Sequence, residues 1–215
     1  MDLPTPIPLD LHTHRPPALA GQAMVSVRPP EFAPQPGACY SVGIHPWYPL
    51  DAQGEWTPLL QHPQVWAIGE AGLDKRCPTD WELQQTLLRQ QIVWSERLCK
   101  PLILHLVGAT EEILALRRTL RPRQAWVVHG FRGKAQLAES YLRQGFYLSF
   151  GSRFQEAALL ATPLDRLFLE TDESSEPIGN LYGRVAGLRG LSLSQLTAAT
   201  QANFRRICPS PTKSF

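Results

Sequence analysis

Short hydrophobic segments bounded by turn-forming residues recur along the whole chain. Several are almost continuously apolar, which is typical of strands buried on both faces of a parallel sheet. Eight segments fit this description, at residues 7–11, 23–27, 38–42, 65–68, 101–104, 125–128, 146–150 and 167–169. The hydrophobic pattern therefore predicts eight strands of a parallel sheet.

Helical patterns lie between the later strands. Thr79-x-x-Glu82 matches a capping box and predicts a helix that continues to about residue 98. Residues 110–120 and 133–144 predict two further amphipathic helices, and Ser192-x-x-Gln195 predicts the start of a final one. Because strands and helices alternate and eight strands are present, the pattern favours a closed (β/α) barrel.

The first part of the chain departs from this alternation. Prolines at positions 16, 17, 29, 30, 34 and 36 exclude regular helices between the first three predicted strands. We therefore expect an α/β fold in a single domain over residues 1–215. It should be a distorted TIM-like (β/α) barrel whose first outer helices are shortened or missing. An open doubly wound sheet is the alternative.

Composition narrows the class of protein without deciding its function. A chain of 215 residues, 43% hydrophobic, is long enough for one substantial core. Its net charge of +2 gives no independent reason to expect a nucleic-acid or membrane partner. No apolar run approaches the roughly 20 residues of a membrane span. The N-terminal residues 1–6 do not resemble a signal peptide. The four cysteines lack any C-x-x-C pairing, so we interpret them as reduced thiols of a cytoplasmic protein.

Six residues with metal-binding side chains follow or end predicted strands. They are His12, His14, Glu70, His105, His129 and Asp172. In a parallel barrel the carboxyl ends of all strands meet on one face, so residues far apart in sequence would share one cup. Taken singly, each has an ordinary alternative as a core histidine, a loop acid or a helix cap. Their joint placement predicts a metal centre.

The ligand types indicate the chemistry of this centre. Four imidazoles and two carboxylates suit one or two divalent ions, and the residues do not distinguish between Zn, Mn, Mg, Fe and Ni. Two ions about 3.5–4 Å apart could stabilise both the attacking and the leaving oxygen of a hydrolysed bond. We predict Asp172 and Glu70 as the catalytic residues, with Asp172 as general base for a metal-activated water.

The motifs around these residues also resemble a known family. Asp10-Leu-His12-Thr-His14, Gly69-Glu70-Ala-Gly-Leu-Asp74 and Glu170-Thr-Asp172 occur in order along the chain, together with the segments around His45, His105 and His129. They look like the TatD family of metal-dependent hydrolases, within the amidohydrolase superfamily. The resemblance implies a TIM-like barrel and phosphodiester hydrolysis, often as a deoxyribonuclease. It also implies that one ion is held by His12, His14, Glu70 and Asp172, and a second by Glu70, His105 and His129.

The residues around the predicted centre depart from that family. Leu106-Val107 stands where Ser-Arg is usual, which removes a phosphate contact. Trp47 stands where a second histidine is frequent, and Glu173-Ser174-Ser175 replaces the usual Ser-Pro. These changes leave the predicted ligands intact and alter the residues that would face the substrate.

Candidate substrate-binding residues also follow strand ends. We predict His45, Arg132 and Arg153 for this role. Together with Arg15, Lys75 and Arg76, the two arginines could surround the cup with positive charge, although solvated loop charge is an equally simple interpretation. Asp74 could support Glu70 or form a turn.

The sequence is compatible with three functions. The first is a phosphodiesterase or deoxyribonuclease acting on single-stranded DNA or a similar substrate, with no membrane or obligate protein partner. The second is hydrolysis of a C–N or carboxylic ester bond in a small-molecule or aminoacyl-tRNA substrate. The third is a non-catalytic metal-binding scaffold, which the complete ligand set argues against.

Overall fold

The eight predicted strands form one parallel sheet in sequence order. The computed structural model describes residues 7–17, 19 and 21–208, so the expectation about residues 1–6 lies outside the described part. Each strand pairs with the next along the chain. The strands are β1 Asp10–Thr13, β2 Ala23–Val27, β3 Cys39–Val42, β4 Val65–Asp74, β5 Leu102–Val107, β6 Trp126–Val128, β7 Tyr147–Phe150 and β8 Leu167–Leu169.

The sheet closes into a barrel just beyond β8. Thr13 and Asp172 form an isolated parallel bridge. The Asp172 N–H donates to the His12 carbonyl at 2.9 Å, and the His14 N–H donates to the Asp172 carbonyl at 3.3 Å. This seam brings the last strand back to the first. The α/β barrel is confirmed, and an open doubly wound sheet does not describe it.

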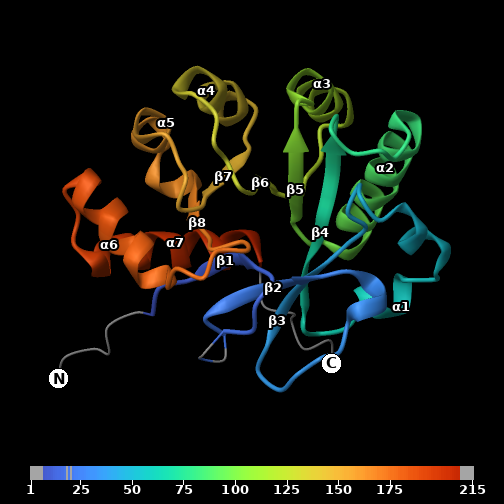
Figure 1. The fold of residues 1–215 in the computed structure, drawn as a ribbon, viewed down its shortest axis with the longest axis horizontal. Helices are drawn as coiled ribbons and strands as arrows, with labels where there is room; N and C mark the ends of the chain where they lie inside the picture. Colours follow the sequence, from blue (N-terminus) through green and yellow to red (C-terminus); the bar gives the residue numbers. More distant parts are fainter. Residues whose placement is uncertain (1–6, 18, 20, 209–215) are drawn as a thin grey trace.

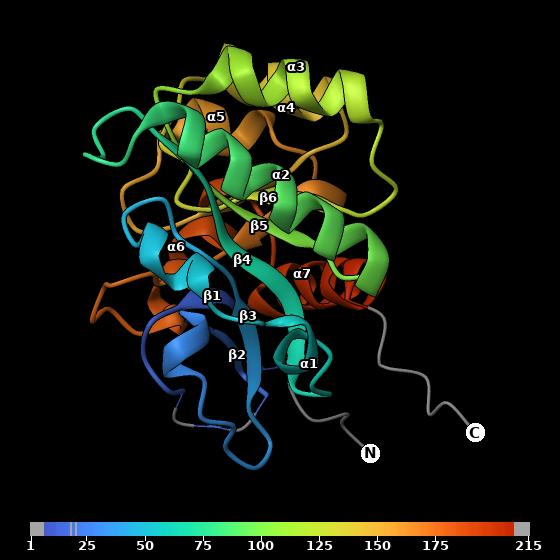
Figure 2. The ribbon, with the colours of Figure 1, turned by 90° about the vertical axis from the view of Figure 1, so that its right-hand side faces the viewer.

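The helices lie outside this ring of strands (Figures 1 and 2). They are α1 Thr57–Leu60, α2 Trp81–Leu98, α3 Thr110–Leu120, α4 Ala135–Arg143, α5 Glu156–Ala161, α6 Ile178–Arg189 and α7 Leu193–Ile207, with the 3₁₀ turns η1 Pro29–Glu31, η2 Pro49–Gln53 and η3 Leu164–Arg166. Between β1 and β3 the only helical element among the described residues is the short 3₁₀ turn η1, as the prolines predicted. None of the described helices is long and apolar enough to cross a membrane.

Helix starts were predicted with mixed success. The capping box at Ser192 and Gln195 is confirmed at α7. The capping role of Thr79 is wrong, because Asp80 is the N-cap of α2 and its Oδ1 accepts a hydrogen bond from the Leu83 N–H at 3.0 Å. A carboxylate at this position also faces the positive end of the helix dipole.

The barrel interior is apolar in the half away from the carboxyl ends of the strands. Leu11, Met24, Ile103, Val127 and Phe168 pack there from different strands, and a larger cluster fills the layer between strands and helices. Towards the carboxyl ends of the strands, the polar side chains of His12, Glu70 and Glu170 are buried. The core therefore supports the carboxyl-end face from below and leaves that face for chemistry.

Two buried glutamines of α2 tie strand ends to the helical layer. Gln91 accepts a hydrogen bond from the Ile44 N–H at 2.7 Å and donates to the Ile44 carbonyl at 2.9 Å. Gln84 does the same for Asp74, at 2.8 and 3.2 Å. Each side-chain amide thus bonds both the N–H and the carbonyl of one residue at or beyond the end of a strand. These contacts fix the segments that carry His45 and Asp74.

Candidate metal centre

The six predicted metal ligands converge on the carboxyl-end face of the barrel. His12 lies within β1 and is completely buried, whereas His14 lies one residue beyond this strand and is partly exposed. Glu70 lies within β4, and His105 lies within β5. His129 directly follows β6, and Asp172 forms the seam with Thr13 beyond the end of β8. The structure therefore brings together residues that are far apart in sequence.

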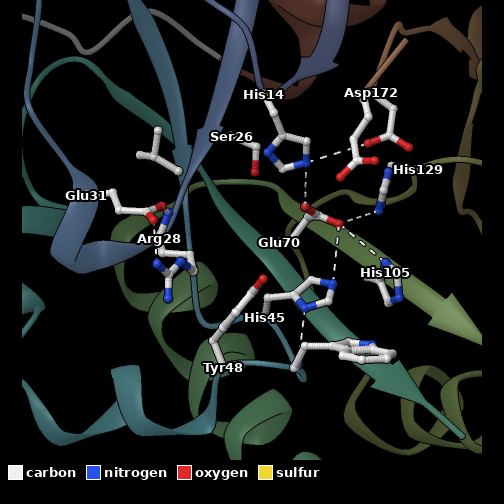
Figure 3. Close-up of a pocket in the computed structure, with 14 residues that line it drawn as sticks. His14, Ser26, Arg28, Glu31, His45, Tyr48, Glu70, His105, His129 and Asp172 are labelled. Carbon is white, nitrogen blue, oxygen red and sulfur yellow. Dashed lines mark hydrogen bonds and ion pairs between the residues drawn. The ribbon is translucent and has the colours of Figure 1, made fainter. Parts of the chain in front are cut away.

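The Glu70 carboxylate is the centre of this group, and its two oxygens face different histidines (Figure 3). Oε2 lies 3.5 Å from His12 Nε2 and 3.3 Å from His14 Nε2. Oε1 lies 2.7 Å from His129 Nε2 and 3.4 Å from His105 Nδ1. One carboxylate thus separates two pairs of imidazoles, which is the arrangement of a bridging ligand.

Asp172 completes the pair formed by His12 and His14. Its Oδ1 lies 3.6 Å from His14 Nε2 and 3.9 Å from His12 Nε2. The backbone of Asp172 has a φ of 55°, a left-handed conformation that aspartate tolerates better than most residues. The seam holds this backbone from both sides through its N–H and its carbonyl. The carboxylate is therefore aimed at the first two histidines by the closure of the barrel.

The donor atoms fit divalent metal ions. Four sets of three residues have potential ligand atoms within 4.8 Å of one another: His12–Glu70–His129, His12–His14–Asp172, His45–Glu70–His105 and His129–Glu170–Asp172. Both ring nitrogens of His12 are buried, yet neither makes a hydrogen bond within the described part of the protein. Buried polar atoms without a partner are costly, and a metal ion would satisfy the Nε2 atom that faces Glu70.

The charges of the group are strongly coupled. Burial alone would raise the pKa of Glu70, but His129 and His12 outweigh it and hold that pKa well below its ordinary value. Burial would lower the pKa of His129, but the Glu70 and Glu170 carboxylates raise it well above its ordinary value. The contact with Glu70 likewise raises the pKa of His14. Cations are therefore favoured around Glu70, as expected for a metal site.

Glu170 is a residue of the centre that the sequence did not predict. It is completely buried, its Oε1 accepts a hydrogen bond from the Gly130 N–H at 2.6 Å, and the same atom lies 3.4 Å from His129 Nδ1. A sequence signal existed, because Glu170 is two residues beyond the interior Phe168 and alternation places both on the same face. Glu170 orients the His129 ring so that Nε2 points at Glu70.

Asp74 does the same for His105. Its Oδ2 lies 3.3 Å from His105 Nε2 and accepts a hydrogen bond from the Trp47 indole N–H at 2.8 Å. Asp74 therefore supports a histidine and does not contact Glu70 directly. The indole donor was not predicted, since Trp47 was noted only as a departure from the family.

The predicted substrate-binding residues lie in different places. His45 lies 3.8 Å from Glu70 through Nε2, and burial lowers its pKa to about 4, so the ring is neutral near pH 7. Arg132 lines a cavity beside His105 and His129, together with Arg76. Arg153 is exposed, and it is not among the described residues that line either of the two cavities at the metal centre. Lys75 pairs with Glu112 at 2.7 Å and is not among the residues that line the cavity of Arg132.

Two cavities meet at the metal centre. One has a volume of about 510 Å³ and is bordered by Arg28, Glu31, Trp47 and Tyr48; we call it the aromatic arm. The other has a volume of about 420 Å³ and is bordered by Arg76, Arg132, Leu106 and Phe131; we call it the basic arm. The two share His105, His129 and Asp172. The centre thus lies at the junction of a two-armed groove.

Comparisons with known proteins agree with this architecture. Residues 31–209 match the family model described as TatD related DNase. The chain is 31% identical over 205 residues to the "3'-5' ssDNA/RNA exonuclease TatD" of Erwinia tasmaniensis, covering 80% of this chain and 79% of that protein. It is 29% identical over 195 residues to the "Uncharacterized metal-dependent hydrolase YabD" of Bacillus subtilis, covering 78% and 76%. The crystal structure of YjjV, a TatD homologue from Escherichia coli, has the same fold, with a TM-score of 0.78 at 21% identity over 95% of this chain and 98% of that one.

Proposed function

The chain belongs to the TatD related DNase family and is a metal-dependent hydrolase; on this premise we propose that it removes nucleotides from the ends of single-stranded DNA or RNA. A relative named as a 3'–5' exonuclease supports that direction of attack. The two-armed groove supports a polymeric substrate, because a chain can continue on both sides of the cleaved bond.

The observation that carries the proposal is the division of the Glu70 carboxylate between two pairs of histidines. We assign one ion to His12, His14 and Asp172 together with Glu70 Oε2. A second ion is assigned to His105 and His129 together with Glu70 Oε1. Such ions supply a nucleophilic water at neutral pH and positive charge for the oxygens of a phosphodiester.

The protein side chains have distinct tasks in this scheme. Asp172 is partly exposed at the junction of both arms, so its carboxylate can accept a proton from the attacking water. Glu170 and Asp74 hold the His129 and His105 rings in the tautomers that direct one nitrogen at Glu70. His45, neutral and adjacent to Glu70, restricts how that carboxylate can rotate.

A second substrate class has one specific observation in its favour. Leu106 and Val107 line the basic arm where the family usually has serine and arginine. An apolar wall accommodates the leaving group of an amide or carboxylic ester better than it accommodates a phosphate. This alternative uses the same ions and the same Asp172 general base.

The decisive experiment incubates the purified protein, loaded with Mn²⁺, Mg²⁺ or Zn²⁺, with single-stranded DNA and RNA oligonucleotides and separately with amide and carboxylic ester substrates. We expect stepwise shortening of the oligonucleotides. Asp172→Asn should slow cleavage by about 10²–10⁴-fold, the usual contribution of a general base. Asp165→Asn, an exposed change in η3, is the matched control. Metal content is measured alongside, because Asp172 is also an assigned ligand.

Two outcomes contradict the proposal. Equal cleavage by wild type and Asp172→Asn would remove the assigned general base. If esters or amides are hydrolysed while the oligonucleotides stay intact, the second substrate class is established instead.

We also propose a cytoplasmic location on the basis of the four free thiols, which localisation of a fluorescent fusion would test.

A further inference from the structure

The two arms of the groove differ in charge. In the aromatic arm, Arg28 is the one arginine or lysine among the described lining residues, and carboxylates already hold it. Arg28 pairs with Glu31 through Nη2 and with Asp51 through Nη1, the latter at 3.3 Å. Glu173 adds a further negative charge to the wall of this arm. A phosphate placed in the aromatic arm would therefore face carboxylates and a guanidinium that is already paired.

The basic arm has the opposite character. Arg76 and Arg132 are exposed on its wall, and neither forms an ion pair within the part of the chain that the structure describes. Asp172, an assigned metal ligand, is the one carboxylate among its described lining residues. Arginines without a carboxylate partner are suited to bind phosphate oxygens.

The aromatic arm offers a surface for a planar group. Trp47 and Tyr48 are 46% and 49% exposed, and both line this arm. Both are held in place: the Trp47 indole donates to Asp74, and the Arg28 guanidinium lies 4.3 Å from the centre of the Tyr48 ring. Figure 3 shows Arg28, Glu31 and Tyr48 on one side of Glu70, and His105 and His129 on the other.

Resting on the proposed function, we infer that the aromatic arm binds the terminal nucleoside of the substrate, stacked on Trp47 or Tyr48 and with no phosphate on its outer end, while the basic arm binds the phosphates of the remaining chain. Stacking on aromatic side chains binds bases without sequence preference. The aromatic arm has a volume of about 510 Å³, which lies within the range of roughly 300–1,000 Å³ that is usual for small-molecule sites. The enzyme would then recognise a free hydroxyl end and reject a phosphorylated one.

Two cleavage measurements test the rejection of phosphate. Two otherwise identical single-stranded oligonucleotides, one ending in a 3'-hydroxyl and one in a 3'-phosphate, are compared by kcat/KM. We expect the phosphate to lower kcat/KM by about two- to thirtyfold, the range for the repulsion of two unit charges about 8 Å apart between the dielectric constant of water and that near a protein surface. The Glu31→Gln and Glu173→Gln double variant should relieve most of this penalty. A 5'-phosphate, at the other end, should have no such effect.

A binding measurement tests the stacking without cleavage. With metal removed by EDTA, 2-aminopurine at the 3' terminus should lose fluorescence when the protein is added, and 2-aminopurine at the 5' terminus should not. Trp47→Leu, made together with Tyr48→Leu, should weaken binding by about 5- to 100-fold, the range of base–aromatic stacking. Trp47→Phe keeps a ring but loses the hydrogen bond to Asp74, so it should bind almost as well as wild type.

The outcomes separate this inference from the proposed function. Cleavage of oligonucleotides with equal kcat/KM for hydroxyl and phosphate ends would overturn the inference and leave the nuclease intact. An unchanged fluorescence of the 3'-terminal 2-aminopurine, or equal losses in Trp47→Phe and in the double variant that carries both Trp47→Leu and Tyr48→Leu, would overturn the stacking. If no nucleic acid is cleaved with any metal, the proposed function fails, and the binding measurement still decides whether the aromatic arm takes a base.

Discussion

Replacing Glu170 by glutamine isolates the effect of a buried charge on the metal centre. Glu170 has no exposed surface, and its Oε2 makes no hydrogen bond within the described part of the protein. Glutamine has the same shape and keeps the Oε1 acceptor for the Gly130 N–H and for His129 Nδ1. The variant therefore removes the negative charge behind His129 while preserving the contacts that hold the loop after β6.

The expected magnitude follows from the geometry. A carboxylate that supports a metal-binding histidine contributes about 10- to 100-fold in metal affinity, which corresponds to about 1.4–2.7 kcal/mol. At saturating metal, the stabilisation that the metal gives the native state should fall by the same amount. For a chain of this size the melting temperature changes by about 2–4 °C per kcal/mol. The shift in melting temperature on adding metal should therefore be about 3–10 °C smaller than in wild type.

Calorimetric titration with Mn²⁺ or Zn²⁺ and thermal melts with and without metal measure both quantities. Glu156→Gln, an exposed change at the start of α5, is the matched control and should behave as wild type. The metal-free melting temperature of Glu170→Gln should stay close to that of wild type. Wild-type metal affinity in Glu170→Gln would refute the role assigned to this carboxylate.

Three further changes test other parts of the structure. Gln91→Leu should lower the free energy of unfolding by about 2–4 kcal/mol, measured by urea denaturation, because it leaves the buried Ile44 N–H and carbonyl without partners; an unchanged midpoint would contradict this. Burial lowers the pKa of Lys100 to about 8, so the native state releases this proton before the unfolded state does, at about 10.4. Wild-type stability relative to Lys100→Met should therefore rise between about pH 8 and pH 10, and a flat difference would be evidence against a buried ammonium. Val107→Arg adds a cation to the basic arm and should steepen the dependence of single-stranded DNA affinity on log salt by about 0.7, as measured by fluorescence anisotropy; an unchanged slope would show that no phosphate lies there.

The strands and most ligands could be predicted because local pattern and topology agree. Strands of a parallel sheet have almost continuously apolar sequences. In a barrel, a histidine that directly follows a strand lies on the carboxyl-end face, so its place in the sequence predicts its place in the structure. His12 and His14 illustrate this, since alternation alone places both on the side of Glu70. The bridging position of Glu70 between two histidine pairs required the resemblance to a family.

The failures have physical reasons too. Helix α6 contains Gly179, Gly183 and Gly187, a composition that disfavours a helix. Its buried side chains, among them Tyr182, pack against the core and outweigh that propensity. Glu170 was missed because an acid just after a predicted strand is usually solvated, and only the closure of the ring shows that it faces inward.

The seam between the two ends of the chain has a consequence for folding. Thr13 and Asp172 are 159 residues apart, and their bridge is flanked by hydrogen bonds from Thr171 to the Asp10 carboxylate. An ion held by His12, His14 and Asp172 would cross-link this loop in the way a disulfide does. In the loop-entropy model a loop of 100 residues is worth about 4.7 kcal/mol when closed. The ion would therefore stabilise the closure between β8 and β1, where Thr13 and Asp172 form an isolated bridge. Amide hydrogen exchange at His14 and Asp172 should slow most when metal is added, so the chemistry of the centre and the mechanical closure of the barrel are one cooperative unit.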